Sequence, residues 1–281
     1  MKYLTIFITA VILMSSGLAK ARTVKLELLW ETESVLQTIE SVLVDKSRGV
    51  MYTSNMNSGG GRGNAFMSKV GMDGKIIELR WVEGLNGPKG MGIVGGNLFV
   101  ADGNELVKID IASGTIVEKT LIEGNPGLND VTVGADGSVY VSGYNSNVIY
   151  KVKDGVVESI FSGERGENFN GLFWEKDRIL LLTSTSSQLK AIDWATSRVT
   201  ILAENLGHGD GIVYIGNGDY ITSDWRGRIF YVPAKGEPVT LLDTREEGFN
   251  AADIDFVMET NTLYVPTFSK NTLRAYKVVI E

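Results

Sequence analysis

Six polar residues recur at one position of a repeating pattern, and five of them carry side-chain oxygens. They are Glu40, Lys89, Asn129, Asn170, Asp210 and Asp253, and we call them the ring residues. Carboxylate and amide oxygens are the ligands that calcium takes in proteins, and buried carboxylates repel one another unless a cation joins them. The set therefore predicts a site for a divalent cation. For each residue alone the alternative is a turn position, because Asn and Asp are common in turns.

The pattern behind these residues is a β-rich unit that repeats at intervals of roughly 40 to 47 residues. Each unit contains a run that ends in Ser, Thr, Asn, Asp or Gly, and the ring residue lies roughly eleven positions before that run. The six runs are Tyr52-Thr53-Ser54-Asn55, Phe99-Val100-Ala101-Asp102, Tyr140-Val141-Ser142-Gly143, Leu181-Leu182-Thr183-Ser184, Ile221-Thr222-Ser223-Asp224 and Tyr264-Val265-Pro266-Thr267. This spacing is typical of the blades of a β-propeller.

We accordingly predict an all-β, six-bladed propeller with four antiparallel strands per blade, in one domain over residues 22–281. The sixth unit lacks a fourth strand, and Val24 to Glu31 alternates in a way that fits this outer strand. The alternatives are a seven-bladed ring and a two-sheet sandwich. In a propeller the first strand of each blade lines the central channel, so the ring residues should meet there. Gly90, Gly171 and Gly211 each follow a ring residue, and we expect them to let the backbone approach a bound ion or ligand.

Composition narrows the function classes. The chain has 281 residues, a formal net charge of -7, one His and no Cys. The negative charge argues against nucleic-acid binding, which needs a basic surface. The missing Cys excludes disulfides and thiolate metal sites, and a single His leaves no multi-histidine metal site. A small-molecule substrate or ligand is the expected partner, and we expect a monomer because a propeller buries its core within each ring.

The first residues have the features of a secretory signal peptide. Lys2 precedes an apolar run from Tyr3 to Met14, and Ala19-Lys20-Ala21 has the small-x-small pattern of a cleavage site. We predict a signal peptide over residues 1–21 and an exported protein, periplasmic or secreted, that has no membrane segment after cleavage. The alternative is an uncleaved membrane anchor, although the apolar run is shorter than the ~20 residues of a membrane span.

Four short stretches give the chain a family resemblance, in their order and spacing rather than singly. They are Ile39-Glu40-Ser41-Val42, Leu128-Asn129-Asp130-Val131, Phe169-Asn170-Gly171-Leu172 and Gly209-Asp210-Gly211-Ile212. On these stretches the sequence resembles the gluconolactonase, senescence marker protein (regucalcin) and luciferin-regenerating enzyme family of six-bladed propellers.

The resemblance implies Glu40, Asn170 and Asp210 as ligands of a divalent cation, usually calcium, with Asn129 beside metal or substrate. It also implies a lactonase reaction in which the cation polarises the lactone carbonyl and Asp210 helps to activate the attacking water. The sugar-lactonase members have a substrate-contacting Arg before the Asn-Asp motif, whereas Leu128 precedes Asn129 here. Recognition of sugar lactones is therefore not implied.

Lys89, Asp253 and His208 are further candidate substrate contacts. Lys89 is predicted either to pair with Asp253 or a substrate anion, or to extend into solvent at the channel mouth. His208 is predicted either to transfer a proton in the site or to be a plain loop residue. The aromatic Trp225 is predicted to lie in a surface turn or in blade packing.

Two functions from different classes remain at this point. The first is a calcium-dependent hydrolase of a lactone or related small ester at the channel. The second is a non-catalytic propeller with a structural metal that binds a small ligand or a protein.

Overall fold

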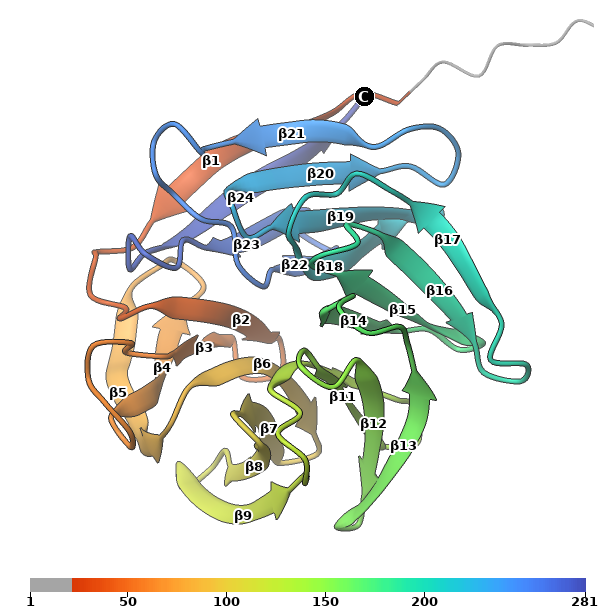
Figure 1. The fold of residues 1–281 in the computed structure, drawn as a ribbon. Helices are drawn as coiled ribbons and strands as arrows, with labels where there is room; N and C mark the ends of the chain where they lie inside the picture. Colours follow the sequence, from red (N-terminus) through yellow and green to blue (C-terminus); the bar gives the residue numbers. More distant parts are fainter. Residues whose placement is uncertain (1–21) are drawn as a thin grey trace, which may run out of the picture.

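A computed structural model describes residues 22–281, and these residues form a ring of six four-stranded antiparallel sheets (Figure 1). The predicted signal peptide lies outside the described residues. The part of the chain that is described contains no helix long and apolar enough to cross a membrane. The prediction of an all-β, six-bladed propeller is confirmed.

Blades 1 to 5 run from the channel to the rim in chain order, whereas blade 6 runs β22-β23-β24 and ends with β1 at the rim (Figure 1). The inner strands are β2 (Ile39–Asp45), β6 (Pro88–Val94), β10 (Leu128–Val133), β14 (Phe169–Trp174), β18 (Gly209–Gly216) and β22 (Asp255–Val257). The second strands are β3 (Val50–Asn55), β7 (Asn97–Asp102), β11 (Val139–Gly143), β15 (Arg178–Thr183), β19 (Asp219–Asp224) and β23 (Thr262–Pro266).

In blades 1 to 5 the third and outer strands form a hairpin, whereas in blade 6 they come from opposite ends of the described region. The third strands are β4 (Ala65–Gly71), β8 (Glu105–Asp110), β12 (Val148–Lys153), β16 (Leu189–Asp193), β20 (Arg228–Val232) and β24 (Leu273–Ile280). The outer strands are β5 (Ile76–Leu85), β9 (Thr115–Leu121), β13 (Val156–Ser162), β17 (Val199–Ala203), β21 (Val239–Asp243) and, for the sixth blade, β1 (Val24–Glu31). Gly74 and Gly114 turn two of the hairpins with φ of 83° and 68°, a conformation that Gly adopts without strain.

The ring is closed by pairing the first described strand with the last. Strand β1 is antiparallel to β24, from Val24 opposite Ile280 to Glu31 opposite Arg274, as the sequence predicts. A second closure lies near the channel, where the Val44 N–H of blade 1 donates to Asp255 Oδ2 of blade 6 at 2.7 Å. Both ends of the described region are therefore held in one blade, and the sheet edge that β24 would otherwise expose is covered.

The hydrophobic core is divided among the contacts between neighbouring blades. Six clusters of buried apolar side chains occur, and each draws its members from two adjacent blades. The cluster between blades 1 and 2, for example, joins Tyr52 and Met67 to Leu98 and Val107, all with no exposed surface. Members of these clusters, such as Val42, Met91 and Ile212, also line one part of the channel, whereas the other mouth is left to polar groups.

Candidate active site at the channel mouth

Irregular pairing at the start of the inner strands turns the ring residues toward the channel. In blades 1 to 5 the register between the first and second strands shifts at the ring residue, as a β-bulge does. The shifts lie between Ile39 and Ser41, Pro88 and Met91, Leu128 and Val131, Phe169 and Leu172, and Gly209 and Ile212. A bulge redirects a side chain, so the repeat places five polar side chains at equivalent points of the ring.

Serines of the second strands hold these bulges in place. In three blades a serine hydroxyl accepts a hydrogen bond from the backbone N–H of the residue that follows the ring residue. The pairs are Ser54 with Ser41, Ser142 with Asp130 and Ser223 with Gly211, at 3.0, 2.9 and 2.8 Å. The serines that recur in the sequence pattern are thus structural, since they satisfy N–H groups that the bulge leaves without a strand partner.

The glycines after the ring residues serve blade packing, which corrects their expected role. A Cβ on Gly90 would lie 2.6 Å from the Cα of Asp130 in the next blade. A Cβ on Gly171 would lie 2.2 Å from the carbonyl oxygen of Asp210. These positions exclude a side chain because adjacent inner strands approach closely, and not because a ligand occupies the space.

Five of the six ring residues and His208 line one pocket of about 280 Å³, which we call the candidate site. Its full lining is Glu40, Met56, Lys89, Asn129, Tyr144, Asn170, Ser184, His208, Asp210, Trp225 and Phe268. Glu40 and Asp210 are each 2% exposed, so two carboxylates are buried in the floor of the site. The structure thus brings together every residue predicted as a metal ligand.

Lys89 supplies a positive charge to this floor. Its Nζ donates to Glu40 Oε1 at 3.1 Å, so it neither extends into solvent nor pairs with Asp253. Burial opposes the ammonium charge, but the carboxylates of Glu40 and Asp210 outweigh it and raise the pKa of Lys89. Burial raises the pKa of Glu40, and burial together with the Glu40 charge raises that of Asp210 well above its usual value. One ammonium therefore does not balance the two carboxylates.

Three buried oxygens in the site have no hydrogen-bond partner. They are Glu40 Oε2, Asn170 Oδ1 and Asp210 Oδ1. Leaving a buried polar atom unpaired costs roughly 1–3 kcal/mol, so such atoms usually have a partner of some kind. All three come from the residues predicted to hold a cation, and two carboxylates with one amide are a ligand set that suits calcium. Within residues 22–281 no three or more side chains of His, Cys, Asp or Glu lie together as a metal site would require. The set described above is of another kind, because one of its three members is the amide of Asn170.

His208 is fixed in the site through its backbone. Its N–H donates to Asp224 Oδ1 at 2.8 Å, and its carbonyl accepts from Trp225 N at 2.9 Å. Burial and the charge of Arg226 lower the pKa of its imidazole. Asp224 has no exposed surface, so the end of β19 is an anchor for the loop before β18. The turn begins at the next residue, Trp225.

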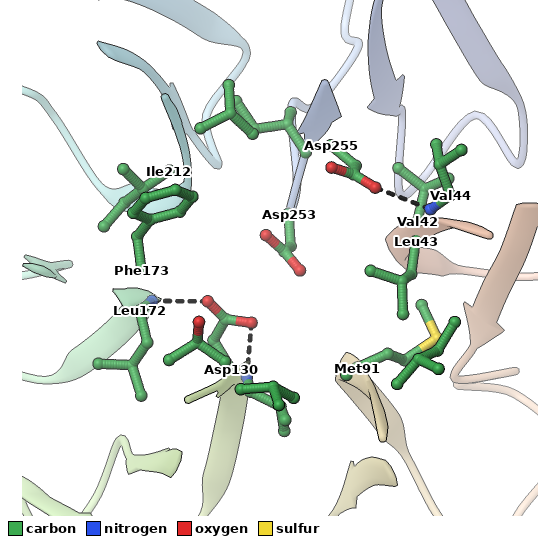
Figure 2. Close-up of a pocket in the computed structure, with 17 residues that line it drawn as sticks. Val42, Leu43, Val44, Met91, Asp130, Leu172, Phe173, Ile212, Asp253 and Asp255 are labelled. Atoms are coloured by element: carbon green, nitrogen blue, oxygen red, sulfur yellow. Dashed lines mark hydrogen bonds between the residues drawn. The ribbon is translucent and has the colours of Figure 1, made fainter. Parts of the chain in front are cut away.

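Asp253 lies elsewhere, which corrects its expected place among the substrate contacts. It lines a second pocket of about 320 Å³, the far pocket, whose walls come from later residues of the same inner strands, such as Val42 and Phe173 (Figure 2). Its Oδ2 accepts from the Ser41 hydroxyl at 2.6 Å, and its backbone N–H donates to the carbonyl of Glu40 at 2.9 Å. The ring is therefore not symmetric, because blade 6 contributes to the opposite part of the channel.

Two more carboxylates of the far pocket join neighbouring blades (Figure 2). Asp130 accepts from its neighbour Val131 N and from Leu172 N of the next blade, both at 2.6 Å. Asp255 accepts from Val44 N and Phe256 N, both at 2.7 Å. Burial raises the pKa of Asp130 to about 7 and that of Asp255 to about 6. These carboxylates hold the backbone together.

Four apolar side chains of the candidate site were not found from the sequence. Met56, Tyr144, Trp225 and Phe268 line the pocket, and we call them the collar. Each comes one or two residues after the second strand of its blade, namely β3, β11, β19 or β23. The sequence contains a signal for these residues, because the repeat places them at equivalent positions of their blades. Residues just beyond a strand are, however, usually interpreted as loop residues. Trp225 is 37% exposed and is not part of the blade packing.

Comparisons with known proteins give similar structures. No family profile and no curated protein matches the chain. A catalytically inactive histidine-to-alanine variant of virginiamycin B lyase from Staphylococcus aureus, solved with quinupristin, matches with a TM-score of 0.68 and 11% identity over 92% of this chain and 100% of that chain. A streptogramin B lyase matches with a TM-score of 0.66 and 10% identity, over 92% of this chain and 98% of the other.

A gluconolactonase from Xanthomonas campestris is also similar, with a TM-score of 0.66 and 15% identity over 86% of each chain. The resemblance seen in the sequence thus has a counterpart among the similar structures, at a distant level. At such identities the likeness shows the propeller fold, and the chemistry must be argued from the candidate site.

Proposed function

We propose that this protein hydrolyses a lactone or a related small ester at the candidate site, with calcium or another divalent cation. The supporting observation is the set of three buried, unpartnered oxygens on Glu40, Asn170 and Asp210. These residues would hold the cation. When bound, the cation would polarise the carbonyl of the substrate as a Lewis acid.

The chain's own groups account for the rest of the reaction. Asp210 accepts a proton from the attacking water as the new bond to the carbonyl carbon forms. The ester C–O bond then breaks, and the leaving oxygen takes up a proton. Lys89 holds positive charge beside the reacting carbonyl, where negative charge develops, and Asn129 offers an amide at 5% exposure to orient the substrate.

The first test is calcium titration by calorimetry of chelator-treated chain 22–281, followed by hydrolysis of a panel of lactones. Wild type should bind one calcium ion and turn over at least one lactone. Asp210→Asn should lose calcium binding and reduce turnover by about a thousandfold. Asp243→Asn is the matched control, because this aspartate of the same blade is exposed and pairs only with Arg245. Unchanged calcium binding and turnover in Asp210→Asn would overturn the proposal.

A second candidate is a lyase that breaks an ester C–O bond by elimination. The favouring observation is His208, the single histidine of the chain, which lines the candidate site, while a similar structure is a lyase whose histidine-to-alanine variant is described as catalytically inactive. In such a step a base takes a proton from carbon, a C=C bond forms and the carboxylate leaves with the electrons of the C–O bond. His208→Ala should then abolish product formation, and mass spectrometry should find the product without added water. Hydrolysis instead adds the mass of one water.

A further inference from the structure

The apolar collar around the polar floor sets the kind of substrate that the candidate site admits. We infer, on the basis of the proposed function, that the substrate is a lactone or ester with an apolar alkyl or aryl substituent, and that polyhydroxylated sugar lactones are excluded. The floor provides the reacting groups, whereas the collar receives the substituent.

The collar is nearly without hydrogen-bonding groups. Met56 and Phe268 provide none that can bind a hydroxyl strongly, and Tyr144 and Trp225 provide one polar atom each. A sugar lactone that enters this pocket must remove several hydroxyls from water, and each one without a partner costs roughly 1–3 kcal/mol. Under the proposed function the polar groups of the floor face the cation and the reacting carbonyl, so hydroxyls on the substituent would face the collar. An apolar substituent gains free energy from the same surroundings.

The collar is built rather than accidental. Trp225 and Phe268 come from different blades and meet edge to face, with ring centroids 5.3 Å apart and an interplanar angle of 75°. Asn250 joins their two loops, because its Nδ2 donates to the carbonyl of Trp225 at 2.9 Å and its Oδ1 accepts from Ser269. Phe268 has φ of 48°, which is costly for a bulky side chain. The aromatic pair is therefore held in place before any ligand arrives, and a preorganised wall gives affinity at low entropic cost.

The remaining positions of the repeat leave room for the reacting group. Where blades 1, 3, 5 and 6 carry collar residues, blades 2 and 4 carry Gly103 and Ser184 just after their second strands. Ser184 accepts from Asn170 Nδ2 at 3.2 Å, so it supports a floor residue. The apolar wall is thus interrupted on the sides of Lys89 and Asn170, where the carbonyl of the substrate would lie.

The test compares three δ-lactones: δ-decalactone with an alkyl substituent, unsubstituted δ-valerolactone, and glucono-δ-lactone. Wild type with calcium should have the highest kcat/KM for δ-decalactone. Trp225→Ala and Met56→Ala should each lower this kcat/KM by about tenfold and change that for δ-valerolactone by less than about twofold, because only the substituent loses contacts. Met258→Ala is the control, since Met258 is 45% exposed and does not line the site.

Binding of the matching lactams, which are not hydrolysed readily, separates the two proposals. If no lactone is turned over but the alkyl lactam binds wild type and not Trp225→Ala, the hydrolase proposal fails and the apolar ligand class is supported. If glucono-δ-lactone is hydrolysed as well as δ-decalactone, the inference is overturned and the hydrolase proposal stands. If none of the lactams binds, and if Trp225→Ala and Met56→Ala behave like Met258→Ala, the inference is overturned.

Discussion

Asp210 and Asp224 are buried aspartates on adjacent strands of blade 5, and their hydrogen bonding differs. Asp224, at the end of β19, accepts from His208 N and Arg226 N and from Arg228 Nε, the last at 2.7 Å. Asp210, at the start of β18, has an oxygen with no partner and shares its pocket with Glu40. Both are almost inaccessible to water. Burial alone therefore does not separate these two aspartates, whereas the presence or absence of a hydrogen-bond donor to each oxygen does.

The largest expected effect is on Asp224. Asp224→Ala should lower the free energy of unfolding by about 4 kcal/mol, because Arg228 loses its buried partner and two backbone N–H groups lose their acceptor. Urea unfolding monitored by circular dichroism measures this. If Asp224→Ala lowered the free energy of unfolding by less than about 1 kcal/mol, Asp224 would not be an anchor and the contrast with Asp210 would fail.

Asp255 sharpens the comparison, because it accepts its hydrogen bonds from neutral backbone N–H groups, those of Val44 and Phe256. Burial raises its pKa from 3.8 to about 6, so the folded chain keeps a proton that the unfolded chain loses. The resulting stability is fully present below pH 3.8 and is lost as the pH rises through about 6. We expect a loss of about 2–3 kcal/mol over this window.

Unfolding free energies at several pH values between these limits test the prediction. Asp255→Asn should lack this part of the pH dependence, since an amide does not titrate. An identical slope in the variant would show that other groups cause it.

The smallest expected effect is on Asp210 in the presence of chelator. Asp210→Asn should change the free energy of unfolding by less than about 1 kcal/mol, because no hydrogen bond to its Oδ1 is lost and the repulsion from Glu40 is relieved. Thermal unfolding of the two proteins without metal gives the difference. A loss as large as that of Asp224→Ala would mean that Asp210 is structural and would remove the contrast.

Much of this molecule was predictable from its repeat. The strand count, the closing strand over Val24–Glu31 and the meeting of Glu40, Asn170 and Asp210 all follow from one pattern repeated six times. Asp253 was misplaced because blade 6 has a short inner strand, β22, that begins two residues after it. The roles of Gly90 and Gly171 were misjudged because clearance between blades depends on distances that a single strand's sequence does not encode.

The collar was missed for a different reason. The alternation of apolar and polar residues along a strand indicates which side chains face the core of a blade. Met56 and Trp225 lie beyond the strand ends, where the chain turns and this alternation stops. Their convergence depends on the curvature of the whole ring.

The pairing of β1 with β24 governs the order in which this protein can fold. Blades 1 to 5 consist of consecutive strands and can form as the chain is made, but blade 6 needs strands that are separated by almost the whole sequence. Contacts of such high sequence separation form slowly. The last interface to assemble is therefore the one that carries Asp255 and Asp253, and β1 must stay unpaired until β24 has emerged. During that interval Val24 and Leu26 lack their final neighbours, which makes β1 the strand most dependent on protection from misassociation.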